Sequence, residues 1–306
     1  MCIRDRYRAF ANIKTIMLED GLEAEFKEIT FPSGIVTIRE SAFENCTNLE
    51  KVTLNKELKY INSFAFNNCT KLKTINIPNS VTEIGVAAFA DCKNLTSINI
   101  PNGVKSICHS AFRGCTNLKT INIPNSVTEI GMGVFEDCKN LTSITIPNSV
   151  KEIGSETFQG CTNLKTINIP DSVIKIGGAS FAHCKSLTSI IIPNSVKEIG
   201  WSTFRDCTNL TSINIPNGVE YIGKDIFKNC KSLKQVTIPN SVTEIQSGAF
   251  RGCTSLKSIK IPNSVIKIIR GFRGEYDPPF EGIDTVYYNG SFQIGSPWGA
   301  KQHIKE

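Results

Sequence analysis

Apolar residues recur along this chain in one arrangement that repeats every 23 residues. Ten cysteines mark this period without a slip, and each has a Phe three residues before it and a Leu three residues after it. They are Cys46, Cys69, Cys92, Cys115, Cys138, Cys161, Cys184, Cys207, Cys230 and Cys253. Such repetition is typical of stacked repeat proteins, in which each unit buries its apolar face against its neighbours.

Within each unit the pattern predicts a strand, a second extended piece and a tight turn. After the Leu, apolar and polar residues alternate as far as a Pro, as in Ile75, Ile77 and Pro78, which is the period of a strand that the Pro ends. A second extended piece is expected at Val81 and Ile84. The Phe-x-x-Cys-x-x-Leu spacing predicts a 3₁₀ or α-helical turn. The Gly that usually precedes this turn is expected to ease the change of direction.

Stacking one such coil on the next predicts a single right-handed solenoid over residues 7–306, about eleven coils long, because equivalent strands pair in a parallel sheet. We expect regular coils at about 26–270 and an irregular C-terminal cap at about 271–306. In this cap Val286–Tyr288 is expected to be the last strand, and Trp298 is expected to cover the final coil.

The repeat resembles the BspA-like type of leucine-rich repeat. Leu95-x-x-Ile98-x-Ile100 matches the leucine-rich-repeat strand, and Ile100-Pro101-x-x-Val104 with Ala111-Phe112-x-x-Cys115 is similar to the BspA-like subclass. The resemblance implies a leucine-rich-repeat solenoid with a parallel β-sheet on the concave face and short extended segments and 3₁₀ or helical turns on the convex side. Many such repeats have a row of Asn where this chain has Ser or Gly, as at Ser80, so we expect the bend to be satisfied differently.

The outward positions of the predicted strands are the two residues after each Leu and the residue between the two Ile. From Lys73 to Lys260 these positions hold no Asp or Glu. The acidic residues are expected on the turns, for example at Glu83, Glu129 and Glu152. The Asn, Thr, Ser and Lys of the concave face offer hydrogen bonds to a protein or a glycan and attract acidic groups, although they also suit a merely soluble sheet.

We predict that partner binding depends on the Asn and Lys of this face, most of all where Lys234, Lys257 and Lys260 converge near the C-terminal end. The candidate partner-binding residues are Lys73, Asn76, Asn99, Lys119, Asn122, Lys165, Asn168, Asn214, Lys234, Lys257 and Lys260.

No catalytic, cofactor or metal site is predicted. Single cysteines 23 residues apart contain no Cys-x-x-Cys pair of the kind that a zinc site uses. We expect buried free thiols, because stacked cysteines would have parallel rather than converging Cβ vectors. His109, His183 and His303 occupy different positions of the repeat, and the neighbouring Cys108 and His109 are not expected to face each other. We therefore expect a protein that is not an enzyme and needs no cofactor.

Charge and hydropathy exclude some classes of partner. The formal net charge of +6, from 34 basic and 28 acidic residues, is spread along the chain, so nucleic acid is not an expected partner. No apolar stretch approaches the roughly 18 residues that a membrane span needs. Residues 1–6 resemble a translated sequencing adapter and are set aside, so the natural N-terminus is expected to be missing.

These observations predict a non-enzymatic scaffold for protein interaction or adhesion. The resemblance implies a fragment of a cell-surface or secreted protein that holds a protein partner on its concave side. A carbohydrate-binding module is the alternative. It is disfavoured because the outward strand positions between Lys73 and Lys260 lack aromatic residues on which a sugar would stack.

Overall fold

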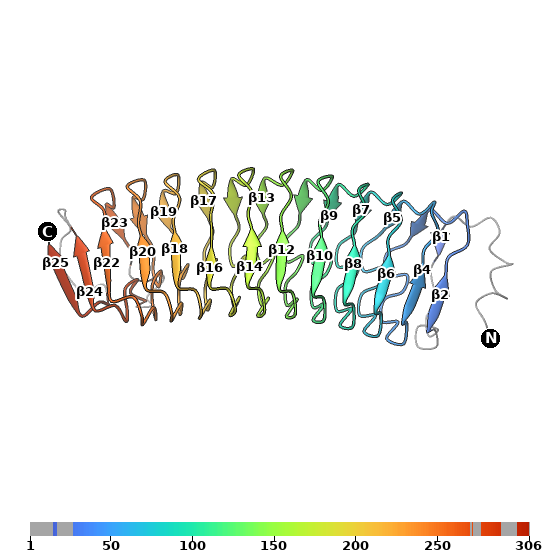
Figure 1. Ribbon diagram of the computed structural model, residues 1–306, viewed down its shortest axis with the longest axis horizontal. Coiled ribbons are helices and arrows are strands. Elements are labelled where there is room, and N and C mark those ends of the chain that lie inside the picture. Colours follow the sequence, from blue (N-terminus) through green and yellow to red (C-terminus); the bar gives the residue numbers. More distant parts are fainter. Residues whose placement is uncertain (1–14, 17–26, 270, 272–276, 289–298, 306) are drawn as a thin grey trace. The chain divides into compact units, whose positions relative to one another are not determined.

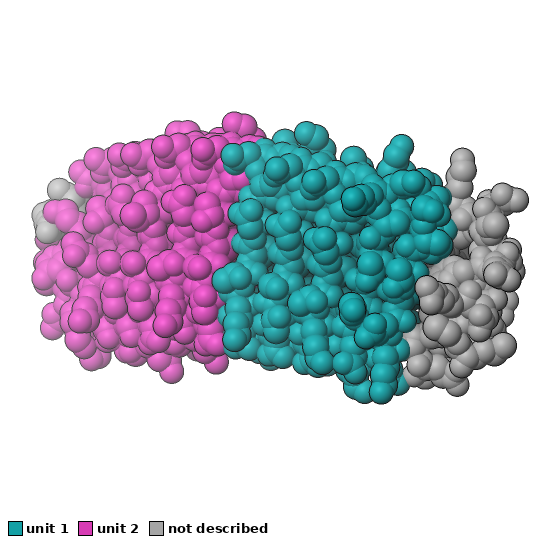
Figure 2. Space-filling model, turned by 45° about the vertical axis from the view of Figure 1, so that its right-hand side comes forward, with its two compact units in different colours: residues 1–141 teal, residues 142–306 magenta. Residues whose placement is uncertain are grey.

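The computed structural model describes residues 15–16, 27–269, 271, 277–288 and 299–305. It divides into two compact units, residues 1–141 and 142–306 (Figure 2). Within each unit, consecutive coils place their strands side by side in parallel (Figure 1). The predicted fold class, a solenoid of stacked parallel strands, is confirmed. That a single solenoid runs through residues 7–306 stays a prediction, and residues 1–6 lie outside the described residues.

Unit 1 contains two parallel sheets. The first is formed by the strands that precede the Pro of each coil, or Asn55 in the coil without one, and it comprises β2 (Glu28–Thr30), β4 (Lys51–Thr53), β6 (Thr74–Asn76), β8 (Ser97–Asn99) and β10 (Thr120–Asn122). The second is formed by the shorter strands that follow this position, and it comprises β1 (Thr15–Ile16), β3 (Thr37–Ile38), β5 (Tyr60–Ile61), β7 (Glu83–Ile84), β9 (Ser106–Ile107) and β11 (Glu129–Ile130). Ile75 of β6 pairs with Ile98 of β8, which is the register that the 23-residue period predicts.

Unit 2 repeats this arrangement, but its sheets are divided into shorter hydrogen-bonded groups: β12-β14, β16-β18-β20 and β22-β24-β25 in the first sheet, and β13-β15-β17 and β19-β21-β23 in the second. The first sheet comprises β12 (Ser143–Thr145), β14 (Thr166–Asn168), β16 (Ser189–Ile190), β18 (Ser212–Asn214), β20 (Gln235–Thr237), β22 (Ser258–Ile261), β24 (Thr285–Tyr288) and β25 (Gln302–Lys305). The second comprises β13 (Glu152–Ile153), β15 (Lys175–Ile176), β17 (Glu198–Ile199), β19 (Tyr221–Ile222), β21 (Glu244–Ile245) and β23 (Lys267–Ile268).

The turn between Phe and Leu is not the predicted helical turn, and the described residues contain no helix. Cys69 donates its N–H to Phe66 O at 3.2 Å, and Leu72 donates to Cys69 O at 3.0 Å, so bonds of the 3₁₀ type are present. The intervening Asn68 has φ 58° and donates to Ala90 O of the next coil at 2.8 Å. A left-handed residue before the Cys therefore interrupts the helix, and Asn, Asp or Gly there limits the strain.

The core of each unit is a stack of phenylalanine rings. In unit 1, Phe43 and Phe66 have ring centroids 5.3 Å apart and planes only 9° from parallel. In unit 2, Phe158 stacks on Phe181 at 5.5 Å, and both side chains are fully buried. Phe280 extends the stack beyond Phe250 at 5.8 Å. The 23-residue period could not identify Phe280, because it follows Phe250 by 30 residues.

The repeated cysteines are buried free thiols, as predicted. They also make a contact that the sequence did not indicate. The Cys92 thiol donates to Phe66 O at 3.2 Å, and the Cys207 thiol donates to Phe181 O at 3.1 Å, in each case a Phe of the preceding coil. Burial raises the pKa of the Cys207 and Cys253 thiols to about 12. Each thiol therefore packs as an apolar group and also links two coils.

The recurring Gly is required by close packing rather than by an unusual backbone angle. A β-carbon on Gly85 would lie 2.6 Å from the carbonyl carbon of Asn62, and one on Gly200 would overlap the backbone nitrogen of Gly178. These glycines have no left-handed φ. The expectation that Gly eases a change of direction is therefore wrong, because the space is taken by the backbone of the preceding coil.

The C-terminal cap has more structure than predicted. The predicted strand at Val286–Tyr288 is present as β24, but it is not the last, because β25 pairs with it in parallel. Ion pairs tie residue 277 to the preceding coils: Arg251 lies 2.8 Å and Lys228 lies 3.6 Å from the Asp277 carboxylate. Trp298 lies outside the described residues.

We expect Phe158→Ala to destabilise the protein by about 3 to 5 kcal/mol, the usual cost of removing a buried aromatic ring. The exposed Thr188→Ala in the same unit serves as the control and should change stability by less than about 0.5 kcal/mol. Denaturant unfolding followed by circular dichroism measures both. A loss below about 1 kcal/mol for Phe158→Ala would contradict the ring stack as the core.

Gly200→Ala should destabilise unit 2 by about 1 to 3 kcal/mol, because the added methyl group overlaps backbone that cannot move away. Gly223→Ala is the matched control, since its β-carbon would meet nothing nearer than 3.5 Å. Thermal unfolding of the two variants should separate them clearly. Equal losses would show that crowding by the preceding coil is not the reason for Gly.

Stability should fall as pH rises above the ordinary thiol pKa. An unfolded Cys loses its proton near pH 8.5, whereas the folded Cys207 retains it to about pH 12. Between these values the unfolded chain binds fewer protons, so each such thiol lowers the free energy of unfolding by about 1.4 kcal/mol per pH unit. Melting curves from pH 7 to 10.5 measure the slope, and Cys207→Ala should make it shallower. A flat profile would mean that the thiols ionise in the folded state.

Candidate functional site: the strand face and a groove between two coils

The strand face, defined here as the outward positions of the first sheet, is exposed as the alternation predicted. In β6 and β8 the middle residue is buried and both flanking residues are exposed. All eleven candidate residues are exposed: Lys73, Asn76, Asn99, Lys119, Asn122, Lys165, Asn168, Asn214, Lys234, Lys257 and Lys260. Their accessibility is therefore confirmed, and their part in binding stays a prediction.

The register brings only some of the candidate asparagines together. In unit 1, Asn99 pairs with Asn76 on one side and with Asn122 on the other, which forms a continuous row of three amides. In unit 2, Asn168 pairs with Thr145 and Asn214 pairs with Thr237 instead. The amide row is thus a feature of unit 1.

The expectation that acidic residues lie on the turns holds for Asp91, Glu136 and Asp137 but not for three others, which lie on the second sheet. Glu83, Glu129 and Glu152 belong to β7, β11 and β13. In unit 2, Lys175 of β15 lies 3.5 Å from Glu152 and 3.8 Å from Glu198, one on each neighbouring strand. These acidic side chains therefore belong to the second sheet and not to the strand face.

The predicted lysine cluster contains a carboxylate that the sequence pattern did not place there. The Lys257 ammonium lies 3.6 Å from the Asp284 carboxylate, which also contacts Lys301 at 2.7 Å. Asp284 precedes β24, whose register with β22 is offset by 27 residues rather than 23. In unit 1, Lys73 is similarly paired with Glu50 at 3.0 Å. Two of the candidate lysines are thus partly neutralised.

Apolar and aromatic side chains also occur on the strand face. Tyr287 of β24 is half-buried beside Lys260, and it pairs with Ile304, which is 41% exposed. Ile191, directly after β16, is 84% exposed. Tyr287 lies beyond Lys260, whereas the outward strand positions that lack aromatic residues run from Lys73 to Lys260.

At the bend that follows the Pro, serine hydroxyls donate hydrogen bonds to backbone carbonyl groups. These serines stand where many leucine-rich repeats have the row of Asn. Ser172 donates to Val150 O and Ser241 donates to Val219 O, both at 2.7 Å, and each acceptor belongs to the preceding coil. The equivalent Ser264 hydroxyl oxygen is buried without a hydrogen-bond partner. The equivalent Ser126 hydroxyl oxygen in unit 1 is likewise buried without a hydrogen-bond partner.

In unit 2 the first sheet is interrupted between β14 and β16 and again between β20 and β22. Among the described residues the strands of each pair are not hydrogen-bonded neighbours, although they belong to successive coils. The central Val236 of β20 is half-buried, as is Ile167 of β14, where the other three-residue strands bury this residue. The groove described below lies at the second interruption, between the coils of β20 and β22. On the second sheet the same two coils stay joined, since Glu244 and Ile245 of β21 pair with Lys267 and Ile268 of β23. The coils are thus joined along one sheet and parted along the other.

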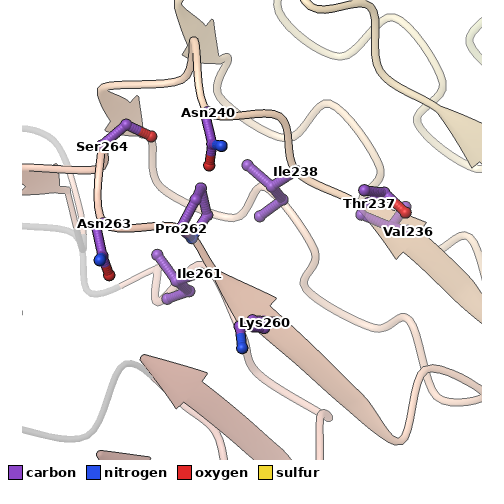
Figure 3. A pocket seen from close by; sticks show the side chains of 9 residues that line it. All are labelled: Val236, Thr237, Ile238, Asn240, Lys260, Ile261, Pro262, Asn263 and Ser264. Atoms are coloured by element: carbon purple, nitrogen blue, oxygen red, sulfur yellow. The ribbon is translucent and has the colours of Figure 1, made fainter. Parts of the chain in front are cut away.

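A groove of about 640 Å³ lies at this interruption (Figure 3). Its apolar lining comprises Val236, Ile238, Ile261 and Pro262, and its polar lining comprises Thr237, Asn240, Lys260, Asn263 and Ser264. Figure 3 shows Ile238, Ile261 and Pro262 in the middle, with Asn240 and Ser264 on the turns beyond them. Lys260 joins this groove to the predicted lysine cluster, so one candidate residue lines a concave feature.

Cys108 and His109, which are adjacent in sequence, each have a different partner. The Cys108 thiol lies 3.6 Å from a Glu83 carboxylate oxygen, and burial together with this negative charge raises the pKa of the thiol. His109 accepts a hydrogen bond from Met132 N–H at its Nδ1. No three His, Cys, Asp or Glu side chains within the described residues are grouped as metal ligands. No described segment forms an apolar helix of membrane-spanning length.

Comparison with known proteins gives a consistent result. A sequence profile of the BspA type Leucine rich repeat region matches residues 22–142, 82–210, 128–254 and 224–272. A leucine-rich repeat protein from Bacteroides ovatus is 30% identical, over 78% of this chain and 79% of that one, with a TM-score of 0.53. One from Eubacterium ventriosum shares the fold at 23% identity, over 89% and 85% of the two chains, with a TM-score of 0.52. No protein of curated function matches with significance.

Proposed function

The chain belongs to the BspA-type leucine-rich repeat family, and from this we propose that it is a non-enzymatic scaffold that binds a protein partner on its strand face. The observation that carries the proposal is the distribution of charge. Outward strand positions from Lys73 to Lys260 hold no acidic residue, while Glu83, Glu129 and Glu152 lie on the second sheet. A surface of one sign with many hydrogen-bonding groups favours a complementary partner and speeds its association.

We further propose a cell-surface or secreted location and an adhesive role, for which the family resemblance is the support. The apolar and aromatic groups on the strand face add to this proposal. The exposed Ile191 and the half-buried Tyr287 are of the kind that anchor protein interfaces when they become buried. Pull-down from a cell-surface extract, followed by cross-linking to the strand face, tests the proposal. Cross-links confined to the second sheet would contradict it.

A glycan partner is the second candidate, and Tyr287 is the observation that favours it, because an aromatic ring beside Lys260 offers a surface for stacking. A glycan array with the parent chain and Tyr287→Ala separates the two functions. Saturable binding that the substitution abolishes would support a glycan. Retained protein binding by the same variant would place the protein contact elsewhere on the strand face.

Reversing Lys234, Lys257 and Lys260 together to Glu should slow association with an acidic protein partner by about tenfold or more and weaken its dependence on salt. Folding stability should barely change, since exposed charges contribute little to it. Surface plasmon resonance at 50 and 300 mM salt measures the association rate.

The control for this variant reverses Lys185, Lys224 and Lys231, three exposed lysines outside the strand face of the same unit. Lys228 is unsuitable, because it lies 3.1 Å from Asp225 and is largely buried. Equal association rates for the parent and both triple variants would contradict the strand face as the binding surface.

A further inference from the structure

We propose that the groove between β20 and β22 binds an acidic side chain of the partner, presented on an extended peptide segment. This inference rests on the proposed function, because it assigns a chemical class of partner to one part of the strand face. Three features of the molecule support it: the interruption of the sheet between the two coils, the groups that line the groove and the charge around it.

Unit 2 has this kind of interruption at two described places in its first sheet, between β14 and β16 and between β20 and β22, and the groove lies at the second. Lys234 donates its N–H to Thr211 O of the preceding coil at 2.9 Å, and Thr285 donates to Lys257 O at 3.0 Å, so the coils on either side are closed. Between them, β20 and β22 are not hydrogen-bonded neighbours. Val236, in the middle of β20, is half-buried and lines the groove.

The lining of the groove suits a carboxylate joined to a peptide. Lys260 supplies a positive charge, and the amides of Asn240 and Asn263 can donate to a carboxylate or bind a peptide backbone. Ser264 adds a hydroxyl whose oxygen has no hydrogen-bond partner, whereas the equivalent Ser241 donates to the preceding coil at 2.7 Å. Ile238 and the neighbouring Pro provide an apolar contact for the carbon chain.

The size and surroundings of the groove favour an acidic segment over a free ion. A volume of about 640 Å³ falls within the range of roughly 300 to 1,000 Å³ usual for ligand sites, and it far exceeds the volume of one carboxylate. Lys234 and Lys257 lie on the strand face beside the groove, and Asp284 offsets one of their charges. The lysines attract an acidic segment, and the outward strand positions of the preceding coils hold no acidic residue that would oppose its approach.

The test uses two fluorescent octapeptides, one of alternating Asp and Leu and one of alternating Asn and Leu, titrated against the whole chain by fluorescence anisotropy. The acidic peptide should bind at least about tenfold more tightly than the neutral one. Lys260→Gln should lower its affinity about tenfold, whereas Lys165→Gln, which removes a strand-face charge far from the groove, should leave it unchanged. Equal affinities for the two peptides, or equal effects of the two substitutions, would overturn the proposal.

Two further variants guard against indirect effects. Asn263→Trp places a large ring at an exposed position of the groove lining and should abolish peptide binding without lowering the melting temperature. Ser264→Ala should weaken binding while leaving the melting temperature equal or higher, because that hydroxyl has no partner to lose. Ser241→Ala, which breaks a bond between coils, should lower it. Peptide binding that survives both Asn263→Trp and Ser264→Ala would exclude the groove.

The failure of this inference can be distinguished from failure of the proposed function. A captured protein partner that is lost on reversal of Lys234, Lys257 and Lys260, but retained by Lys260→Gln and Asn263→Trp, would leave the scaffold intact and refute the groove. Peptide binding with the expected response to both substitutions, but no protein bound on the strand face, would refute the scaffold and leave the groove as an acidic-ligand site.

Discussion

Every coil must lie at the same short distance from the next, and the rest of the structure depends on this constraint. Parallel strands fix that distance at about 4.8 Å, so any group repeated in each coil meets its own copy in the next. A position that is apolar and planar becomes a ring stack, as at Phe43 and Phe66. A small polarisable thiol reaches a carbonyl of the preceding coil, as Cys92 does. Where a β-carbon would overlap the backbone of the preceding coil the residue is Gly, as at Gly200. The composition of the repeat thus follows from the spacing.

Repetition made much of this fold predictable from the sequence. Each position is sampled about ten times, so the buried positions around Cys69, the end of a strand at Pro78 and the 23-residue register could all be read from the pattern. The form of the turn could not. The Phe-x-x-Cys-x-x-Leu spacing fits both a helical turn and a run of three-residue turns, and the choice depends on the left-handed Asn68, whose N–H finds an acceptor only in the neighbouring coil. Sequence spacing contains no information on that contact.

The candidate site was predictable to the same extent. Exposure of the Asn and Lys positions follows from strand alternation, and the structure shows it at every predicted residue. The local partners of those residues did not follow, because they come from places where the period fails. Asp284 reaches Lys257 across an offset of 27 residues, and Phe280 joins the ring stack after a gap of 30. The parting of β20 from β22 occurs between two coils whose sequences remain regular, so no pattern of residue types marks it.

That parting also affects how unit 2 bears load. In a repeat array each interface between coils contributes separately to stability, so the array is as strong under tension as its weakest interface. The coils that carry β20 and β22 are joined through β21 and β23 but not through the first sheet. The coils of β14 and β16 lack the same ladder and are joined through β15 and β17, and turn bonds such as Phe227 N–H to Ala249 O at 2.8 Å also hold the coils of β20 and β22 together. A pull on unit 2 would therefore be borne at these two interfaces by one sheet and the turns, and at the other interfaces by more of the backbone ladder.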